Sequence, residues 1–283
     1  MAALKETVYS PDSELKSFKS LMVSIFRSFY DGRGLAKRIF IRNKKALYRQ
    51  SIFGYLWAFM PPIATAAVWI LLRGQKVINF NETDIPYPIY VFSGVMLWQI
   101  FVDAVQVPLK TIKSAKSILV KLNFPRESLL LASFYEVLFN AGVKLSVLAV
   151  FLLINKAIPT PMILLAPVAI LSLIFFGLSI GILLTPLGML YHDVQKGLQV
   201  VFQFLMFMVP VIYPLAKGNV MYKINILNPI TPLLMNARNL ITNGEIYDLN
   251  GFVGVSVFAL ALFLFSVIIY RVAIPHLVER MGS

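Results

Sequence analysis

The decapeptide YRQSIFGYLW, residues 48–57, divides the chain into two parts of opposite character. Residues 1–50 hold eleven of the chain's 26 lysines and arginines, whereas long apolar stretches follow almost to the C-terminus. In membrane proteins, Lys and Arg collect in the loops on the cytoplasmic side. The decapeptide therefore marks the predicted cytoplasmic entrance to a first membrane span.

The composition indicates an all-α polytopic membrane protein. Hydrophobic residues make up 58% of the 283 residues and charged residues only 14%, whereas a soluble domain has about 25% charged residues. The net charge of +13 would suit nucleic acid, but the basic residues lie between apolar stretches, so we expect no nucleic-acid partner. Because the chain has no cysteine, disulfides and Cys-ligated metals are excluded.

Residues 1–50 form a predicted cytoplasmic interface region of two amphipathic helices. We predict the first helix over residues 11–30, ended by Gly32 and Gly34, and a second, more basic helix after it. Such helices lie in the headgroup plane of anionic membranes; packing on a soluble partner is the alternative. The apolar stripe of the first helix has helical spacing and consists of Leu15, Phe18, Met22, Ile25 and Phe29.

Six spans are predicted, each of which needs about 20 apolar residues. They form a transmembrane domain over residues 51–275, followed by a short cytoplasmic tail at 276–283. Six spans place both termini on one side of the membrane. That side would carry 19 of the lysines and arginines and the opposite side six, which predicts cytoplasmic termini. The spans are 51–72, 89–107, 128–154, 162–190, 197–213 and 252–273.

A charge-free stretch, residues 224–237, lies between the fifth and sixth predicted spans. Pro229 and Pro232 interrupt it, so it is too short to cross the membrane. Short apolar pieces of this kind are typical of re-entrant or interfacial helices. An ordinary exposed loop is the alternative.

Polar residues recur at helical spacing inside three spans. A charge at mid-span costs about 2.5–3.5 kcal/mol on insertion scales, so these residues either line a polar path or subunit seam, or form hydrogen bonds that only hold the bundle together. We expect Asp103 to pair with Lys144 or Glu136. The three lines are Gln99, Asp103 and Gln106; Glu136, Asn140 and Lys144; and Gln195, Gln199 and Gln203.

Aromatic residues in the first and fifth spans are candidates for stacking on sugar rings, although a membrane-interface belt would also explain them. Together with two glutamines they form the candidate substrate path: Tyr55, Trp57, Phe59, Gln199, Gln203, Phe207 and Tyr213.

The sequence contains no G-x-x-x-x-G-K-[ST] loop for ATP. No Ser–His–carboxylate or metal-ligating constellation stands out, and Asp193 alone makes a poor active site. We therefore expect no cofactor or metal in this chain. A membrane-embedded glycosyl- or acyltransferase, which would need a catalytic carboxylate or His near the interface, stays a rival function.

Five short motifs follow one another in the chain: residues 48–57 with Pro61, FPRE at 124–127, YHDV at 191–194, PVIYP at 210–214, and NPIT at 228–231 with Arg238 and Gly244. In this order they resemble the permease subunit of type-2 ABC exporters of polysaccharides, the exporters of O-antigen, capsule and teichoic acid. The likeness runs from about Arg38 to the C-terminus. His192 departs from it, because the family usually has Arg at that place.

The resemblance implies a homodimer in a bacterial inner membrane, with two separate ATP-binding cassette subunits that bind ATP and Mg. The implied cargo is a lipid-pyrophosphate-linked glycan, and teichoic acid, a small lipid or a drug are the alternatives. Membrane lipids would surround the spans. Residues 110–127 and 191–196 would contact the ATPase, so the candidate coupling residues are Phe124, Pro125, Arg126, Glu127, His192 and Asp193.

Overall fold

The computed structural model describes residues 18–48, 59–77, 83, 85–121, 124–157, 160–191, 193–215 and 220–282. Every regular element in this part of the chain is a helix. The elements are α1 (Phe18–Tyr48), α2 (Met60–Gly74), α3 (Tyr87–Ser114), α4 (Lys116–Lys121), α5 (Glu127–Ile154), η3 (Pro161–Leu165), α6 (Ala166–Leu190), α7 (Asp193–Met208), α8 (Val220–Leu227), α9 (Ile230–Thr242) and α10 (Leu249–Gly282).

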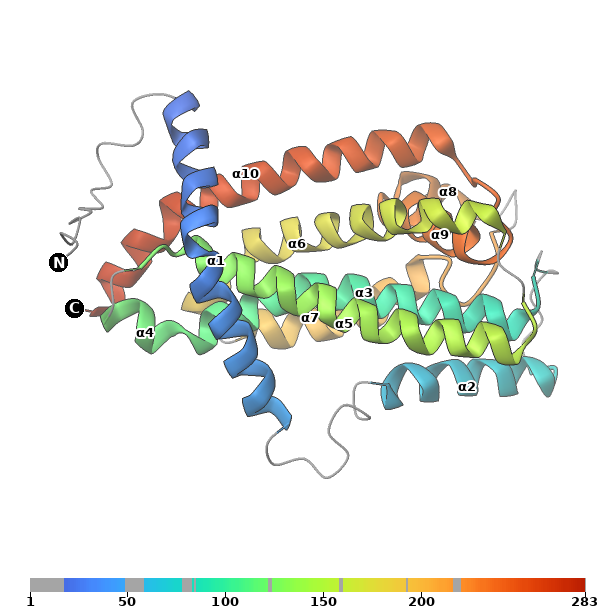
Figure 1. The fold of residues 1–283 in the computed structure, drawn as a ribbon. Helices are drawn as coiled ribbons and strands as arrows, with labels where there is room; N and C mark the ends of the chain where they lie inside the picture. Colours follow the sequence, from blue (N-terminus) through green and yellow to red (C-terminus); the bar gives the residue numbers. More distant parts are fainter. Residues whose placement is uncertain are drawn as a thin grey trace.

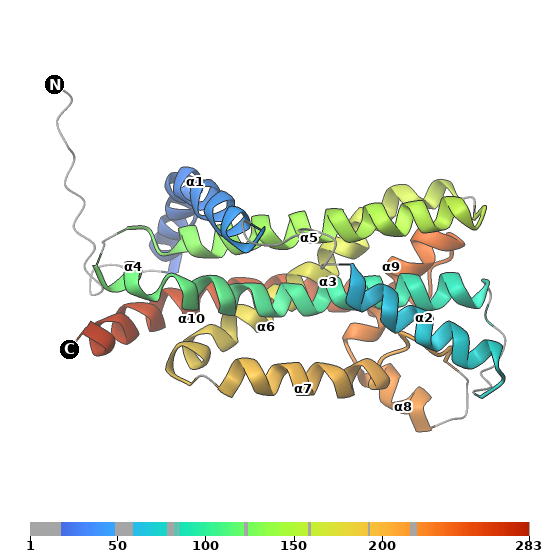
Figure 2. The same ribbon diagram turned by 90° about the horizontal axis from the view of Figure 1, so that it is seen from below.

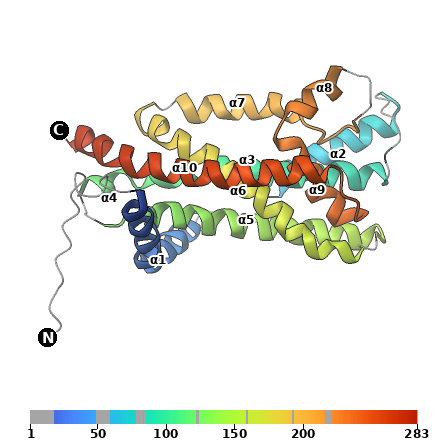
Figure 3. The same cartoon turned by 90° about the horizontal axis from the view of Figure 1, so that it is seen from above.

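The long helices lie side by side and alternate in direction (Figures 1 and 2). Helices α2, α5 and α7 run one way, and α3, α6 and α10 run back. The central helix is α3, most of whose residues are buried and which packs against α2, α5 and α6. Helix α1 crosses the bundle at the end where α4 and the C-terminal end of α10 lie, and α8 and α9 occupy the opposite end (Figures 1 and 3).

Four helical stretches of the described residues are long and apolar enough to cross a membrane: Tyr87–Ser114, Glu127–Ile154, Pro161–Leu190 and Leu249–Glu279. They coincide with the second, third, fourth and sixth predicted spans. The predicted tail, residues 276–283, continues α10 as far as Gly282.

The first and fifth predicted spans correspond to shorter helices. Helix α2 has 15 residues, and residues 51–58, which precede it in the predicted span, lie outside the described residues. Helix α7 has 16 residues and ends at Met208, whereas the predicted span ran to residue 213. The helix ends there because Pro210 has no N–H to donate and disfavours helical geometry at the residue before it.

The prediction of two N-terminal helices was wrong, because α1 is one continuous helix from Phe18 to Tyr48. Gly32 lies where α1 crosses α5, and a Cβ atom there would be 2.5 Å from the Ser128 Oγ. A glycine inside a helix costs about 1 kcal/mol relative to alanine. The close approach offsets this cost by burying Ile25, Ala36 and Ile39 of α1. The start of the predicted first helix, residues 11–17, lies outside the described residues.

The stretch predicted as re-entrant or interfacial helices contains α8 and α9. Every residue of α9 from Ile230 to Arg238 is buried, and α9 packs against α3 and α6. The alternative of an ordinary exposed loop was therefore wrong.

Small residues bring α3 and α6 into close contact. A Cβ atom at Gly181 would lie 2.4 Å from the Val105 carbonyl oxygen, and one at Gly177 would lie 2.7 Å from the Ala104 Cβ. In membranes, where there is little hydrophobic force between helices, such approaches supply the van der Waals contact that holds helices together.

We predict that Gly181→Ala lowers the stability of the purified protein in detergent by about 1–3 kcal/mol, the usual cost of overpacking. The matched control is Gly254→Ala in α10, where a Cβ atom would meet nothing within 4 Å and where alanine favours the helix. Thermal unfolding of both variants measures the difference. Equal melting temperatures would contradict the α3–α6 contact.

Candidate functional site

Five polar side chains from three helices form a line that we call the charge ladder: Lys44, Glu136, Asn140, Lys144 and Asp103. The Lys44 Nζ donates to the Asn140 Oδ1 at 2.7 Å and lies 3.4 Å from the Glu136 Oε1. The Lys144 Nζ donates to the Asp103 carboxylate. The ladder therefore links α1 to α5 and α5 to α3.

The Asp103–Lys144 pair confirms one sequence expectation, but Glu136 pairs with Lys44, which the sequence analysis missed. Glu136, Asn140 and Lys144 follow one another at intervals of four, which places them on one face of α5. The spacing of the polar residues in α5 does not reveal that a lysine of α1 reaches this face. The only available signal was that the second and third spans together carry two acidic residues, Asp103 and Glu136, and one basic residue, Lys144.

Burial makes the pairing in the ladder necessary. Lys44 and Lys144 are each only 6% exposed, and an ammonium group removed from water is stable only when it is paired and hydrogen-bonded. Burial lowers the pKa of Lys44, and the Glu136 carboxylate opposes that shift. The Glu136 carboxylate therefore favours the charged form of Lys44 against the effect of burial.

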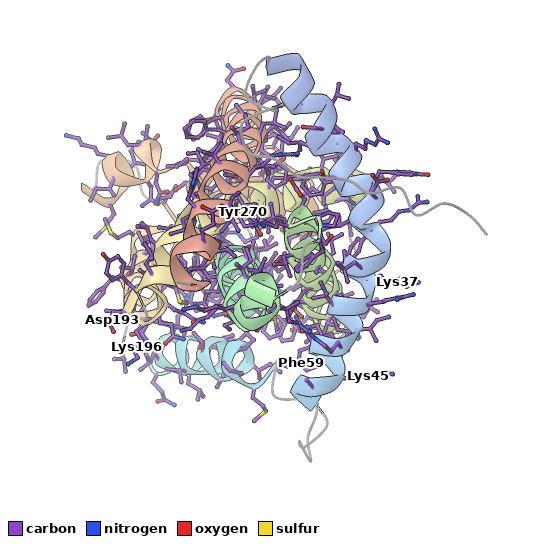
Figure 4. The ribbon with its side chains drawn as sticks, turned by 90° about the vertical axis from the view of Figure 1, so that its left-hand side faces the viewer. Lys37, Lys45, Phe59, Asp193, Lys196 and Tyr270 are labelled. Atoms are coloured by element: carbon purple, nitrogen blue, oxygen red, sulfur yellow. The ribbon has the colours of Figure 1, made fainter. Side chains whose placement is uncertain are left out.

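The loop that carries the candidate coupling residues is tied to α10. Glu127, the first residue of α5, is buried and lies 3.0 Å from the Arg271 Nη1. The Tyr270 hydroxyl, inside the bundle in Figure 4, donates to the Arg126 carbonyl oxygen at 3.1 Å. Phe124 and Pro125 are half-buried in the same loop. The Glu127–Arg271 pair thus holds the loop in place. A role of residues 124–127 in coupling to the ATPase stays a prediction.

Asp193 is exposed at the first turn of α7. Figure 4 views the molecule from the α1 end and shows Asp193 and Lys196 on one side and Lys37 and Lys45 of α1 on the other. The candidate residue His192 lies outside the described residues.

At the opposite end of the bundle, α3 and α9 hold the turn that follows α7. The Arg238 side chain is completely buried; its Nη1 donates to the Pro210 carbonyl oxygen at 2.8 Å, and its guanidinium lies 3.6 Å from the centre of the Tyr90 ring. The Tyr90 hydroxyl donates to the Tyr213 carbonyl oxygen at 2.8 Å, and the Tyr87 hydroxyl donates to the Ile212 carbonyl oxygen at 3.0 Å. The sequence motifs included Arg238 and this turn but not the two tyrosines.

Tyr213, a candidate for the substrate path, is tied into the same turn. Its hydroxyl donates to the Phe207 carbonyl oxygen at 2.9 Å and accepts from the Asn225 Nδ2 at 3.3 Å. Thr231 donates to the Asn225 Oδ1 at 3.0 Å. Contacts from α8 and α9 therefore hold Tyr213 in place.

The remaining path candidates that the structure describes lie along α7 and at the start of α2. Gln199, Gln203 and Phe207 recur at intervals of four and are exposed, which places them on one outer face of α7. Phe207 packs edge-on against Trp69 of α2 with ring centres 5.9 Å apart, and Phe59 directly precedes α2. Tyr55 and Trp57 lie outside the described residues. Contact with a substrate stays a prediction for all of them.

We predict that Lys144→Met destabilises the protein because it leaves Asp103 without its cation. Loss of one partner from a fully buried pair costs about 3–5 kcal/mol, and we expect less here because the Asp103 side chain keeps 27% exposure. Thermal unfolding in detergent measures the loss, and Lys144→Met combined with Asp103→Leu should recover most of it. An unchanged melting temperature in Lys144→Met would contradict the pairing.

We also predict that Arg238→Met destabilises the end of the bundle by about 1–3 kcal/mol, the cost of leaving buried polar groups unsatisfied. Arg73→Met is the matched control, because Arg73 stacks on Tyr87 at 4.1 Å but is half-buried, so its loss should cost about 0.5–1 kcal/mol. Equal losses in thermal unfolding would contradict the buried role of Arg238.

The profile of the ABC-2 type transporter family matches residues 35–242. The chain is 28% identical to the O-antigen export system permease protein RfbA of Myxococcus xanthus, over 69% of this chain and 74% of that protein. It is 22% identical to a protein of the same name from Klebsiella pneumoniae, over 83% of this chain and 93% of that protein.

A further relative is the polysialic acid transport protein KpsM of Escherichia coli, which is 21% identical over 80% of this chain and 86% of that protein. The family match covers every element from the second half of α1 to α9, and with it the charge ladder, the loop before α5 and the Arg238 contacts. The chain therefore belongs to the ABC-2 type transporter family and is a membrane permease subunit, not an enzyme, that works with ATP-binding subunits.

Proposed function

We propose that this chain is the membrane-spanning subunit of an ATP-driven exporter that moves a lipid-linked polysaccharide, similar to O-antigen, across the bacterial inner membrane. One observation carries the proposal: the relatives that align over 69–83% of the chain are named for O-antigen export and polysialic acid transport. Both names refer to long glycans, which favours a glycan over a drug or a small lipid.

The proposed topology has six spans, formed by α2, α3, α5, α6, α7 and α10, with both termini in the cytoplasm. The alternating directions of these helices support it, as does the position of α1 at the same end as the C-terminal end of α10 (Figure 1). Helices α2 and α7 would complete the crossing with the residues that flank them. Helices α8 and α9 would then form the re-entrant region on the outer side.

The proposed assembly is a homodimer. Gln199 and Gln203 are exposed on α7 in the single subunit, and amide groups that face lipid are costly. A second copy beside α2 and α7, with the glycan between the subunits, would give these glutamines polar neighbours. Membrane lipids would contact the exposed apolar residues Val23, Phe26 and Tyr30 of α1.

The energy would come from two ATP-binding cassette subunits that hydrolyse ATP with Mg. In the proposed complex they contact the segments 110–127 and 191–196. The Glu127–Arg271 pair holds residues 124–127 of the first segment against α10, and the second segment contains the exposed Asp193 at the start of α7. The lipid pyrophosphate of the glycan would approach from the same side, where most of the lysines and arginines lie.

Deletion of the gene that encodes this chain should stop export of the glycan and cause the lipid-linked precursor to accumulate inside the cell. The natural sequence should restore export, but not when the partner ATPase carries a substitution of its phosphate-binding lysine. Surface staining for the glycan and extraction of the lipid-linked precursor measure the two effects. Normal surface glycan in the deletion strain, or full activity with the inactive ATPase, would contradict the proposal.

A further inference from the structure

Helix α1 is attached to α5 at three places. Gly32 crosses at Ser128, where a Cβ atom at position 32 would lie 3.4 Å from the Ser128 Cβ. Phe40 packs edge-on against Phe139, with ring centres 5.9 Å apart. Lys44 then reaches Glu136 and Asn140. From Ser128 to Asn140 these contacts extend along about 18 Å of α5, because a helix rises about 1.5 Å per residue.

The three attachments differ in how strictly they fix position. Apolar and aromatic packing is non-directional, so the contacts at Gly32 and Phe40 fix how closely α1 and α5 approach but do not require one particular pairing of polar groups. A buried ion pair does require one, because displacement leaves both charges in a low-dielectric region without partners. The Lys44–Glu136 pair therefore fixes the register of α1 along α5.

Helix α5 passes this position on to the rest of the bundle. Its first residue, Glu127, is paired with Arg271 of α10, and Lys144, further along, is paired with Asp103 of the central helix α3. A displacement of α1 that keeps the Lys44–Glu136 pair must therefore move α5 together with its partners.

We propose that Lys44 and Glu136 are a positioning pair through which α1 and α5 move as one body, so that ATP-driven motion at the α1 end reaches α3 and α10. The inference rests on the proposed ATP-driven export. In the proposed transporter Lys44 and Glu136 would contact neither ATP nor the glycan, so they act through the helices that they join.

The test compares Lys44→Met, Glu136→Gln and the exchange Lys44→Glu with Glu136→Lys, each in the complete transporter with its ATPase subunits. Lys45→Met is the matched control, because Lys45 is the next residue of α1 and points away from the bundle (Figure 4). Export of the glycan and ATP hydrolysis are measured on the same preparations, after assembly has been checked by co-purification.

Each single variant should reduce export about 2- to 30-fold, the range expected for residues that transmit coupling, while the assembled complex continues to hydrolyse ATP. The exchange should restore export, because it returns opposite charges to the two positions, and Lys45→Met should export normally. A pair that is merely structural would instead lose assembly, export and ATP hydrolysis together.

Three outcomes would overturn the positioning role: Lys44→Met exports as fast as Lys45→Met, export and ATP hydrolysis fall in parallel, or the exchanged pair assembles without restoring export. In each case the natural chain still exports, so the proposed function stands. A natural chain that exports no glycan would instead refute the proposed function.

Discussion

The structure depends on one electrostatic constraint: the charges that the spans carry into the bundle must be neutralised by partners within the protein. Helix α5 carries Glu136 and Lys144, and the chain supplies a partner for each, Lys44 from α1 and Asp103 from α3. Since unpaired charges in this environment are costly, the pairing determines where α1 lies and how α5 faces α3. The amphipathic N-terminal helix is therefore part of the bundle's internal packing.

The same constraint operates at both ends of the bundle. At the α1 end, Glu127 and Arg271 fix the start of α5 against α10. At the other end, the buried Arg238 holds the turn after α7 through the Pro210 carbonyl and the Tyr90 ring. Between these ends, close contacts at Gly177 and Gly181 bring α3 and α6 together without any charge. Small residues thus pack α3 against α6, whereas buried charges position α1 and α5 and hold the two ends of the bundle.

Much of the fold could be predicted, because long apolar segments and helical periodicity are local properties of the sequence. Four predicted spans and the short helices before α10 are found in the structure. The errors came from tertiary contacts: Gly32 permits a close approach to Ser128 instead of ending a helix. For the candidate site, the spacing in α5 predicted a polar face and the pair with Asp103, but the partner of Glu136 lies 92 positions away in the sequence and on another helix. No local pattern identifies such a partner.

Whether α1 and α5 move as one body can be tested by joining the two helices covalently. The natural chain has no cysteine. A Cβ atom at position 32 would lie 3.4 Å from the Ser128 Cβ, which is close to the roughly 3.5–4.5 Å between the two Cβ atoms of a disulfide. Gly32→Cys with Ser128→Cys can therefore be oxidised to lock the two helices together, and export can be measured before and after reduction in the assembled transporter. If the two helices move as one body, export is equal in the oxidised and reduced states. Export that stops on oxidation and returns on reduction would contradict it, because α1 would then have to leave α5 during the transport cycle.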